Sequence, residues 1–380
     1  NIEFVQVSAS QSGQFPYYCG IDKNGQAWCW GSNVSGQLGN NTTTESIVPV
    51  KVAGAHKFQQ ISTGYNHTCA IDKDEQSWCW GDNSSSQLGH NIDDTQKLIP
   101  VKVTGSHKFK KITTGFDFTC ALDREGKAWC WGTSSSGQLG GELEPGAVRK
   151  TPSLASSNYL FKDIDAGNYF VCGIATDGAA YCWGDNGSRQ LGSFFYGLSP
   201  IPPYSGTIGS LIDLANNPAN ITTSYDNTPI GVMSSIVITG NTYQFTFNFL
   251  PYAQISAGGN TACALDPDGT AYCWGYNSHY QTGDVFNSSQ GTKDRPIPIK
   301  VNTNEKFKSI EVGAYHTCGI TKGSGSIAEN TTLCWGNNSS GQLGINVSGG
   351  TRQAPATVAT VSSSPNKFRQ ISLGANSSLG

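Results

Sequence analysis

Residues 58–103 read FQQISTGYNHTCAIDKDEQSWCWGDNSSSQLGHNIDDTQKLIPVKV, and similar units recur along the whole chain. Aligned on their Cys-Trp-Gly tripeptide, the repeats begin at Phe4, Phe58, Phe109, Phe161, Tyr252 and Phe307, and a truncated seventh begins at Phe368. A fixed period of about fifty residues is typical of an array of supersecondary units that pack on one another. The repeat therefore predicts a single domain over residues 1–380.

The second repeat contains four short segments with the character of β-strands: Phe58–Ser62, Thr68–Ile71, Ser77–Trp80 and Pro100–Val103. Each segment is apolar or alternates between apolar and polar residues, and Gly, Asn, Asp or Pro bound it. No part of the repeat has a helical period. Four strands per unit around a ring predict an all-β fold, a β-propeller with six or seven four-stranded blades.

All twelve cysteines fall into pairs, one pair in each complete repeat. The pairs are Cys19 with Cys29, Cys69 with Cys79, Cys120 with Cys130, Cys172 with Cys182, Cys263 with Cys273 and Cys318 with Cys334. A structural zinc site needs close pairs and four ligands, whereas each repeat offers two well-separated cysteines. The even number and the repetition indicate six disulfides, which are typical of proteins in an oxidising compartment.

The turn between paired cysteines predicts how the two strands register. In the first repeat the turn is DKNG at residues 22–25, with Asp at its start and Gly where a positive φ is needed. Continuing outward from this turn places Cys19 directly opposite Cys29, so that the sulfurs meet on one face of the hairpin. Trp28 and Trp30 then point to the other face, because side chains alternate along a strand.

The composition excludes several classes of protein. Only 13% of the residues are charged and the net charge is −3, so no basic face for nucleic acid is predicted. No apolar run approaches the ~20 residues of a membrane span, and no membrane insertion is predicted. The Asp-rich turns lack the longer loop and distal Glu of a calcium site, and no catalytic motif is present. We therefore expect no cofactor, no metal site, no catalytic residue and no enzymatic activity.

Motifs shared by the repeats resemble those of the regulator of chromosome condensation (RCC1) repeat family. The resemblance is carried most clearly by Trp80-Gly81-Asp82-Asn83, by Gln87-Leu88-Gly89 and by Gly64-Tyr65-Asn66-His67-Thr68-Cys69. It covers nearly the whole chain except about residues 199–250. It implies a β-propeller, usually of seven blades. A second Cys before the Trp departs from the commoner family pattern, and this departure marks a disulfide-stapled variant.

The resemblance does not imply one function, because the same fold serves unrelated functions. Members of the family include a guanine-nucleotide exchange factor, a plant ultraviolet sensor and a secreted bacterial β-lactamase inhibitor. Six disulfides conflict with an intracellular exchange factor, and the nine Trp residues sit at repeat positions that predict blade core. His67 and His316 occupy a shared position of the repeat, which predicts a structural role rather than catalysis or metal binding.

The main break in the pattern is residues 199–250, which we expect to be an insertion within the fourth repeat. Its segment 234–250 predicts a β-hairpin, because aromatic residues alternate with polar ones there. The aromatic residues of this region are candidate binding residues: Phe194, Phe195, Tyr196, Tyr243, Phe245, Phe247 and Phe249. They either pack back onto the rim of the propeller or bind a partner.

The second break is the truncated seventh repeat, residues 368–380, which has Leu379 where a Cys is expected. A propeller must close, because an unpaired blade exposes strand edges. Three explanations are open: a longer native chain, closure at six blades with a spare strand, or completion by another subunit. The chain begins at Asn1 without a Met, so we expect either a removed signal peptide or a segment of a longer protein.

Asn-x-Ser/Thr sequons are abundant, and several coincide with the Asn of the Trp-Gly-x-Asn loop. The better candidates for glycosylation are Asn41, Asn220, Asn287, Asn330 and Asn346. Together these features predict a non-catalytic extracellular or cell-surface propeller. It is expected to act as a structural or protein-interaction module that binds a protein partner or associates with itself. The alternative is a lectin-like carbohydrate binder or a secreted binder that resembles an enzyme inhibitor.

Overall fold

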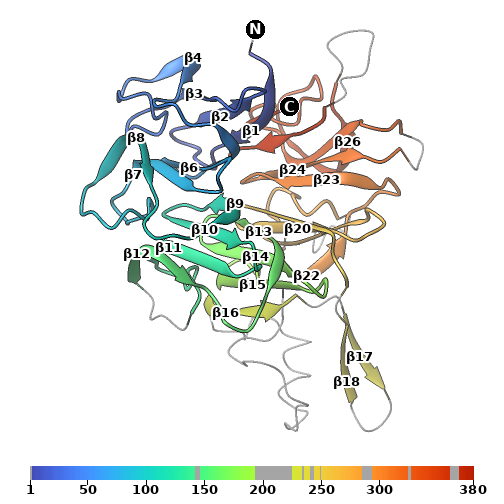
Figure 1. Cartoon of the computed structure of the whole chain (residues 1–380). Helices are drawn as coiled ribbons and strands as arrows, with labels where there is room; N and C mark the ends of the chain where they lie inside the picture. Colours follow the sequence, from blue (N-terminus) through green and yellow to red (C-terminus); the bar gives the residue numbers. More distant parts are fainter. Residues whose placement is uncertain are drawn as a thin grey trace.

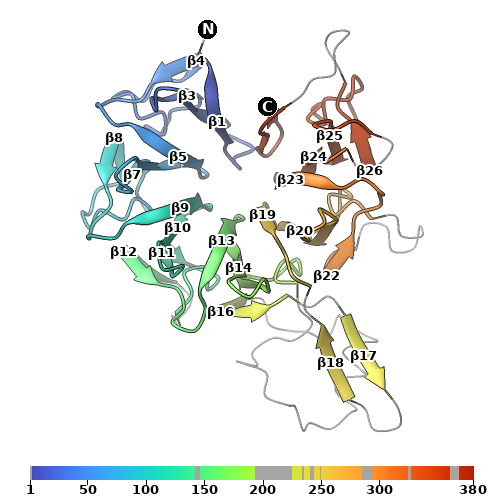
Figure 2. The same cartoon turned by 45° about the vertical axis from the view of Figure 1, so that its right-hand side comes forward.

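The computed structural model describes residues 2–141, 146–192, 225–232, 235–239, 244–248, 250–284, 293–323, 327–359 and 368–380. Every regular element of these residues is a β-strand. The strands form six four-stranded antiparallel sheets arranged around a ring, as Figures 1 and 2 show. Within the described residues no helix is long and apolar enough to cross a lipid bilayer. The predicted β-propeller is confirmed, and the repeats supply its blades in chain order.

The first three blades come from the first three repeats. Blade one is β1 (Phe4–Ala9), β2 (Tyr17–Asp22), β3 (Ala27–Gly31) and β4 (Ser46–Lys51). Blade two is β5 (Phe58–Thr63), β6 (His67–Asp72), β7 (Ser77–Asp82) and β8 (Gln96–Lys102). Blade three is β9 (Phe109–Thr114), β10 (Phe118–Asp123), β11 (Ala128–Ser134) and β12 (Ala147–Leu154).

The second half of the ring has the same order of strands. Blade four is β13 (Phe161–Ala166), β14 (Phe170–Ala175), β15 (Ala180–Asp185) and β16 (Tyr225–Gly231). Blade five is β19 (Gln254–Gly258), β20 (Thr261–Leu265), β21 (Ala271–Gly275) and β22 (Arg295–Lys300). Blade six is β23 (Phe307–Val312), β24 (His316–Thr321), β25 (Thr332–Asn337) and β26 (Thr351–Thr357). The first strand of each blade lines the centre of the ring and the fourth lies at its rim (Figure 2).

The six predicted disulfides are confirmed, one in each blade. They join Cys19 with Cys29, Cys69 with Cys79, Cys120 with Cys130, Cys172 with Cys182, Cys263 with Cys273 and Cys318 with Cys334. In every blade the two cysteines lie directly opposite each other on the second and third strands, as the turn predicts for the first repeat.

The fourth strand of blade two starts earlier than predicted, at Gln96 rather than Pro100. Pro100 is tolerated within it because β8 is an outermost strand, whose free edge needs no backbone donor. The first three strands of this blade lie where the sequence predicts them, within one or two residues at their ends. The rim strand is therefore the part of the repeat that the residue pattern describes least well.

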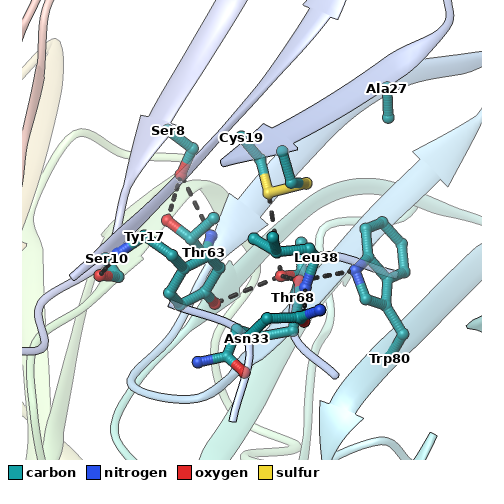
Figure 3. The surroundings of a disulfide bond; sticks show 12 residues. Ser8, Ser10, Tyr17, Cys19, Ala27, Asn33, Leu38, Thr63, Thr68 and Trp80 are labelled. Atoms are coloured by element: carbon teal, nitrogen blue, oxygen red, sulfur yellow. Dashed lines mark hydrogen bonds between the residues drawn. A yellow bond between two sulfur atoms is a disulfide. The ribbon is translucent and has the colours of Figure 1, made fainter. Parts of the chain in front are cut away.

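Five disulfides lie in the core between two blades, and the sixth lies in a cluster with the seventh repeat. Cys19 and Cys29 of blade one share a buried cluster with Leu38 and with Trp80 of blade two. Figure 3 shows Trp80 and Thr68 of blade two close to Cys19 and Leu38 of blade one. Within one blade the sulfurs and the tryptophans point to opposite faces, as predicted. Because the blades stack around the ring, the stapled face of each of the first five blades meets the tryptophan of the next.

A tryptophan hydrogen bond recurs at five junctions between blades. The Nε1 atom donates to the backbone oxygen of the Gln in the Gln-Leu-Gly or Gln-Thr-Gly loop of the preceding blade, at 2.9 to 3.1 Å. The pairs are Trp80 with Gln37, Trp131 with Gln87, Trp183 with Gln138, Trp274 with Gln190 and Trp335 with Gln281. All five side chains are fully buried. Trp30 of blade one is half-buried and has no such bond among the described residues.

The seventh repeat forms a short hairpin between blades six and one, made of β27 (Ser372–Leu373) and β28 (Ser378–Leu379). Its Ser372 hydroxyl accepts a hydrogen bond from the backbone N of Ala9 at 2.9 Å. The Ser378 hydroxyl donates to the backbone oxygen of Gln342 at 2.8 Å. Threonines make the equivalent bond at other junctions, so the hairpin occupies the place of a seventh blade's first two strands.

The stretch 199–250 is more complex than the single insertion expected from the sequence. Its residues 225–231 form β16, which pairs with β15 as the fourth strand of blade four. Strands β17 (Ser235–Thr239) and β18 (Gln244–Asn248) follow and form the expected hairpin, in which Ile236 lies opposite Phe247. Figures 1 and 2 show that the backbone of this hairpin extends away from the ring.

Glutamine side chains link neighbouring inner strands. In three blades a glutamine amide donates to the backbone oxygen, and accepts from the backbone N, of one residue in the first strand of the next blade. These glutamines are Gln6, Gln60 and Gln254. Lys111 of blade three takes the same place in the repeat and forms an ion pair with Asp163 of blade four. The glutamine amide therefore links two first strands that belong to different sheets and share no backbone hydrogen bonds.

A cluster of charges lies where this glutamine pattern is broken. Lys111, Asp165 and Glu311 come from the inner strands of blades three, four and six, and the Ser256 hydroxyl donates to Glu311 at 3.4 Å. Burial raises the pKa of the Glu311 carboxyl to about 8, and repulsion by Asp165 adds to the rise. The neutral acid is therefore the favoured form of Glu311 at physiological pH.

The Glu311→Gln variant is expected to be more stable than the wild type above pH 8, by on the order of 2 kcal/mol. Glu311 has a higher pKa in the folded state than in the unfolded state. Unfolding therefore releases a proton between about pH 4.5 and pH 8, so wild-type stability falls as the pH rises through this range. Thermal unfolding at pH 5 and pH 9 measures the difference, with the exposed Glu125→Gln as the control. A gain at pH 5 as large as that at pH 9 would contradict the interpretation.

Candidate functional site

One face of the ring carries the connections from first to second strand and from third to fourth strand of each blade, because the strands are antiparallel. We call it the loop face, and its first-to-second connections include residues 64–66, 115–117, 167–169, 259–260 and 313–315. Backbone bonds tie these loops to one another around the ring. The N atom of Phe116 donates to the oxygen of Asn168 at 3.0 Å, and the N atom of Asn168 donates to the oxygen of Gly259 at 2.9 Å. These bonds link the loops of blades three, four and five directly.

Three aromatic rings from three blades stack in a line on the loop face. The ring centroids of Tyr65 and Phe116 lie 4.0 Å apart, with their planes inclined by 28°. Those of Phe116 and Tyr169 lie 5.1 Å apart, inclined by 29°. All three side chains are half-buried. We call Tyr65, Phe116 and Tyr169 the aromatic row.

Glycine places this row at the surface. Phe116 directly follows Gly115, and a Cβ atom at Gly115 would lie 2.0 Å from the ring of Phe118. The side chain of any other residue at position 115 would collide with this buried ring. Glycine therefore allows the backbone of the loop to lie directly against Phe118. Phe118 fills the core from below while Phe116 is left at the face. The local sequence GFDF therefore alternates buried and surface aromatics.

Three carboxylates lie along the aromatic row. Burial raises the pKa of Asp117 to about 6, and repulsion by Asp82 contributes. Burial also raises the pKa of Tyr169 to about 12, and the charges of Asp117 and Asp185 add to this rise. Glutamine amides are the side-chain donors for these carboxylates: Gln87 for Asp82, Gln138 for Asp117 and Gln190 for Asp185. The row is therefore an aromatic surface with a negative border.

A second aromatic group lies on the loop face over blades five and six. The ring of His279 lies 6.2 Å from Tyr276 and 5.1 Å from Tyr315. Tyr315 is 38% exposed. Burial lowers the pKa of His279, which favours the neutral imidazole at this place. The rings of this group are tilted rather than stacked, so they make a less regular platform than the aromatic row.

The described residues do not test the aromatic candidates named from the sequence. Five of them lie outside the described residues: Phe194, Phe195, Tyr196, Tyr243 and Phe249. The backbone of Phe245 and Phe247 is part of β18, but the surroundings of their side chains are also outside the description. They stay candidates, and the structure adds the aromatic row to them.

The two repeat histidines are structural, as predicted. His67 is fully buried and its Nε2 lies 3.0 Å from the Thr119 hydroxyl of the next blade. His316 is also buried, and its Nε2 lies 2.9 Å from the Ser378 hydroxyl. Burial lowers the pKa of His67 to about 3 and that of His316 to about 4, so both stay neutral. Among the described residues no group of three or more His, Cys, Asp or Glu side chains is placed to hold a metal ion.

Burial separates the glycosylation candidates. Asn41 and Asn346 are exposed, whereas Asn330 is half-buried and its amide oxygen accepts from Lys308. Asn220 and Asn287 lie outside the described residues. The Asn residues of the Trp-Gly-x-Asn loops are buried in hydrogen-bond networks, for example Asn33 and Asn83. This burial agrees with the preference for sequons outside the repeat motif.

The aromatic row was not predicted from the sequence, although a signal for it exists. Tyr65 and Phe116 both follow the glycine that ends the first strand of a repeat, where no core position is expected. Tyr169 stands one residue later in its own repeat. Only the ring of blades brings the three loops together, so the repeat alone does not show that these residues stack.

Comparison with known proteins gives matches over nearly the whole chain. The family model described as an RCC1-like domain matches residues 3–380. The ultraviolet-B receptor UVR8 of Arabidopsis thaliana is 27% identical over 336 residues, which cover 83% of this chain and 74% of that protein. The family-model match extends across all six blades and the short hairpin after them.

Solved structures share the fold at lower identity. Yeast RCC1 (Prp20), solved with Kap60 bound, has a TM-score of 0.73 at 17% identity and covers 99% of this chain and 79% of that one. The entire ectodomain of the receptor kinase CR4 from Physcomitrella patens has a TM-score of 0.52 at 18% identity. It covers 99% of this chain and 69% of that one.

Proposed function

The chain belongs to the RCC1-like domain family, and from this we propose that it is a non-catalytic interaction module of an extracellular or cell-surface assembly. It binds a protein partner, or a second copy of itself, through the loop face. The single observation that carries the proposal is the aromatic row Tyr65–Phe116–Tyr169, which the described part of the propeller leaves half-exposed. Aromatic residues at a surface with a polar border are typical of protein interfaces.

The extracellular setting is supported by the disulfides. Twelve cysteines form six disulfides and none is free. Disulfides of this number are rare in cytosolic proteins, where thiols are kept reduced. The shared fold of the CR4 ectodomain is compatible with this setting. Asn41 and Asn346 are the proposed glycan acceptors, because they are exposed sequon residues on the described surface.

The double variant Tyr65→Ser/Phe116→Ser is expected to weaken binding to the partner at least tenfold, because aromatic anchors carry much of the free energy of an interface. The partner is first cross-linked to the purified chain in the extracellular fraction of its source and identified. Its dissociation constant is then measured with purified proteins, and sedimentation of the chain alone reports self-association.

The matched control is Ile47→Ser/Val48→Ser on β4. These two residues are exposed apolar side chains of the rim, at 94% and 60%. The control is expected to leave the dissociation constant within a factor of two. A partner that is lost with the rim variant and retained with the row variant would place the interface on the outer strands instead.

A carbohydrate ligand is the alternative function for the same face. The Oδ1 atoms of Asn66 and Asn260 are shielded from solvent and have no hydrogen-bond partner among the described residues. Amide groups beside an aromatic platform are the chemistry with which a sugar hydroxyl and a sugar ring are bound. Binding of a glycan that is lost in the Tyr65→Ser/Phe116→Ser variant would favour this alternative.

A further inference from the structure

We propose that the hairpin β17–β18 joins two copies of this chain, because β18 of one copy pairs with β18 of the other. The two β18 strands run antiparallel across a two-fold axis. They form a four-stranded sheet in which the two β17 strands are outermost. This contact does not use the loop face, so it holds or fails independently of the proposed function.

The outermost strand of every blade is closed to such pairing. Each one has a proline directly before the residue that lies opposite the second cysteine of its blade. The register shifts at the same place, which indicates a β-bulge. A proline removes a backbone donor and a bulge interrupts the ladder, so both protect a free edge. The six prolines are Pro49, Pro100, Pro152, Pro229, Pro298 and Pro355.

The hairpin has none of these protections. Its strands pair in an unbroken register, from Ser235 opposite Asn248 to Thr239 opposite Gln244. Neither strand contains a proline, and the sequence of residues 227–265 contains no charged residue. In the described structure β17 and β18 pair only with each other, so each strand keeps one free edge. An uncharged edge with high β-propensity is a template for another strand.

The sequence of β18 is self-complementary in an antiparallel pair. It reads Gln244-Phe245-Thr246-Phe247-Asn248, which is nearly the same in both directions about Thr246. With Thr246 on the two-fold axis, Phe245 lies opposite the partner's Phe247. Gln244 then lies opposite the partner's Asn248. Aromatic pairs and Thr–Thr pairs are favourable at directly opposed positions of a ladder. A two-fold contact needs such symmetry, because the same residues meet from both sides.

The aromatic residues favour β18 over β17 as the pairing edge. The sequence of β17 is SIVIT, which is also nearly symmetrical. Paired with its own copy, β17 brings isoleucine opposite isoleucine, whereas β18 brings phenylalanine opposite phenylalanine. Aromatic pairs add an attraction between rings to the burial of apolar area. The free edge of β18 is therefore the better template.

A four-stranded sheet also supplies the stability that two strands lack. An isolated two-stranded hairpin is at best marginally stable in water, and three or more strands with an apolar face are needed. Figures 1 and 2 show the hairpin apart from the six blades. By register, Ile236 shares one face with Phe247, and Ile238 shares the same face with Phe245. Pairing two hairpins unites both apolar faces in one sheet.

The two-fold register allows a test by exchange of charge, with the full chain followed by sedimentation velocity. The wild type is expected to show a monomer–dimer equilibrium in the micromolar range. The Thr246→Lys variant places two like charges directly opposite each other, so we expect dimerisation to weaken by at least about tenfold. The Thr246→Glu variant is expected to behave in the same way. An equimolar mixture of the two variants is expected to restore the dimer, because opposite charges then meet across the axis.

The matched control is Val237→Lys. Val237 lies opposite Thr246 on β17, so this variant adds the same charge to the same face of the hairpin. In the proposed sheet the two β17 strands lie about 14 Å apart, three strand spacings, which exceeds the screening length of about 10 Å at 0.1 M salt. The dimer is therefore expected to be unchanged. It is also expected to persist in Tyr65→Ser/Phe116→Ser, which separates this contact from the loop face.

A wild-type chain that stays monomeric throughout the micromolar range would overturn the proposal. A dimer that persists in Thr246→Lys would overturn it too, as would a mixture of the two charged variants that stays monomeric. Loss of the dimer in Val237→Lys but not in Thr246→Lys would contradict the assignment to β18 and place the contact on β17. Loss of the dimer in the aromatic-row variant would assign self-association to the loop face instead.

Discussion

Reduction of the six disulfides is expected to unfold the propeller at 37 °C. Five disulfides join cysteines ten positions apart, and the sixth joins cysteines sixteen apart. A covalent loop of this size lowers the entropy of the unfolded chain and stabilises the fold by about 3 kcal/mol. Six of them together exceed the total stability of a typical native protein, about 5–15 kcal/mol. Circular dichroism during heating, with and without a phosphine reductant, measures the effect.

Single disulfides are expected to contribute unequally, which provides the control for reduction. Cys120 and Cys130 lie in a buried cluster with Trp183 of the next blade, so their replacement by alanine removes packing as well as the covalent link. The same change at Cys318 and Cys334 affects a cluster that the shorter seventh repeat completes. We expect the first variant to be the less stable of the two in thermal unfolding. If the reduced protein unfolds at the same temperature as the oxidised protein, the disulfides do not contribute to the stability of the fold.

The local part of this structure could be predicted because it follows from short-range rules. Cys19 lies opposite Cys29 because a four-residue turn and a period of two leave one register for the hairpin. Strand β16 was not predicted, since its sequence YDNTPIG contains residues that normally mark turns. An outermost strand pairs along one edge only and therefore tolerates proline and polar residues.

Contacts between blades were beyond prediction from the repeat. The stacking of Tyr65 on Phe116 depends on the angle between blades two and three, and no residue pattern within one repeat encodes that angle. The packing of Trp80 is a second example. The strand pattern predicts that Trp80 is buried, but it does not show that Trp80 packs against the disulfide of blade one. The candidate site consists of such contacts, so it became visible only with the ring.

The Trp131→Ala variant is expected to destabilise the fold by about 3–5 kcal/mol. Trp131 is fully buried, and its Nε1 donates to the backbone oxygen of Gln87 in the preceding blade at 2.9 Å. The variant leaves a cavity beside the disulfide of Cys69 and Cys79 in blade two. It also removes one hydrogen-bond donor from the backbone oxygen of Gln87. Chemical denaturation followed by fluorescence of the remaining tryptophans measures the loss of free energy.

Trp30→Ala is the matched control, because Trp30 has the same place in its repeat. Trp30 is half-buried and packs on Phe4 and Tyr18, with centroid distances of 5.6 and 5.8 Å. It has no glutamine acceptor in the described structure, so its loss is expected to cost about 1–2 kcal/mol. A cost at Trp30 as large as that at Trp131 would mean that the first blade has a complete neighbour in solution. A small cost instead identifies the hairpin β27–β28 as the weakest junction of the ring, since a half-built blade covers less of Trp30.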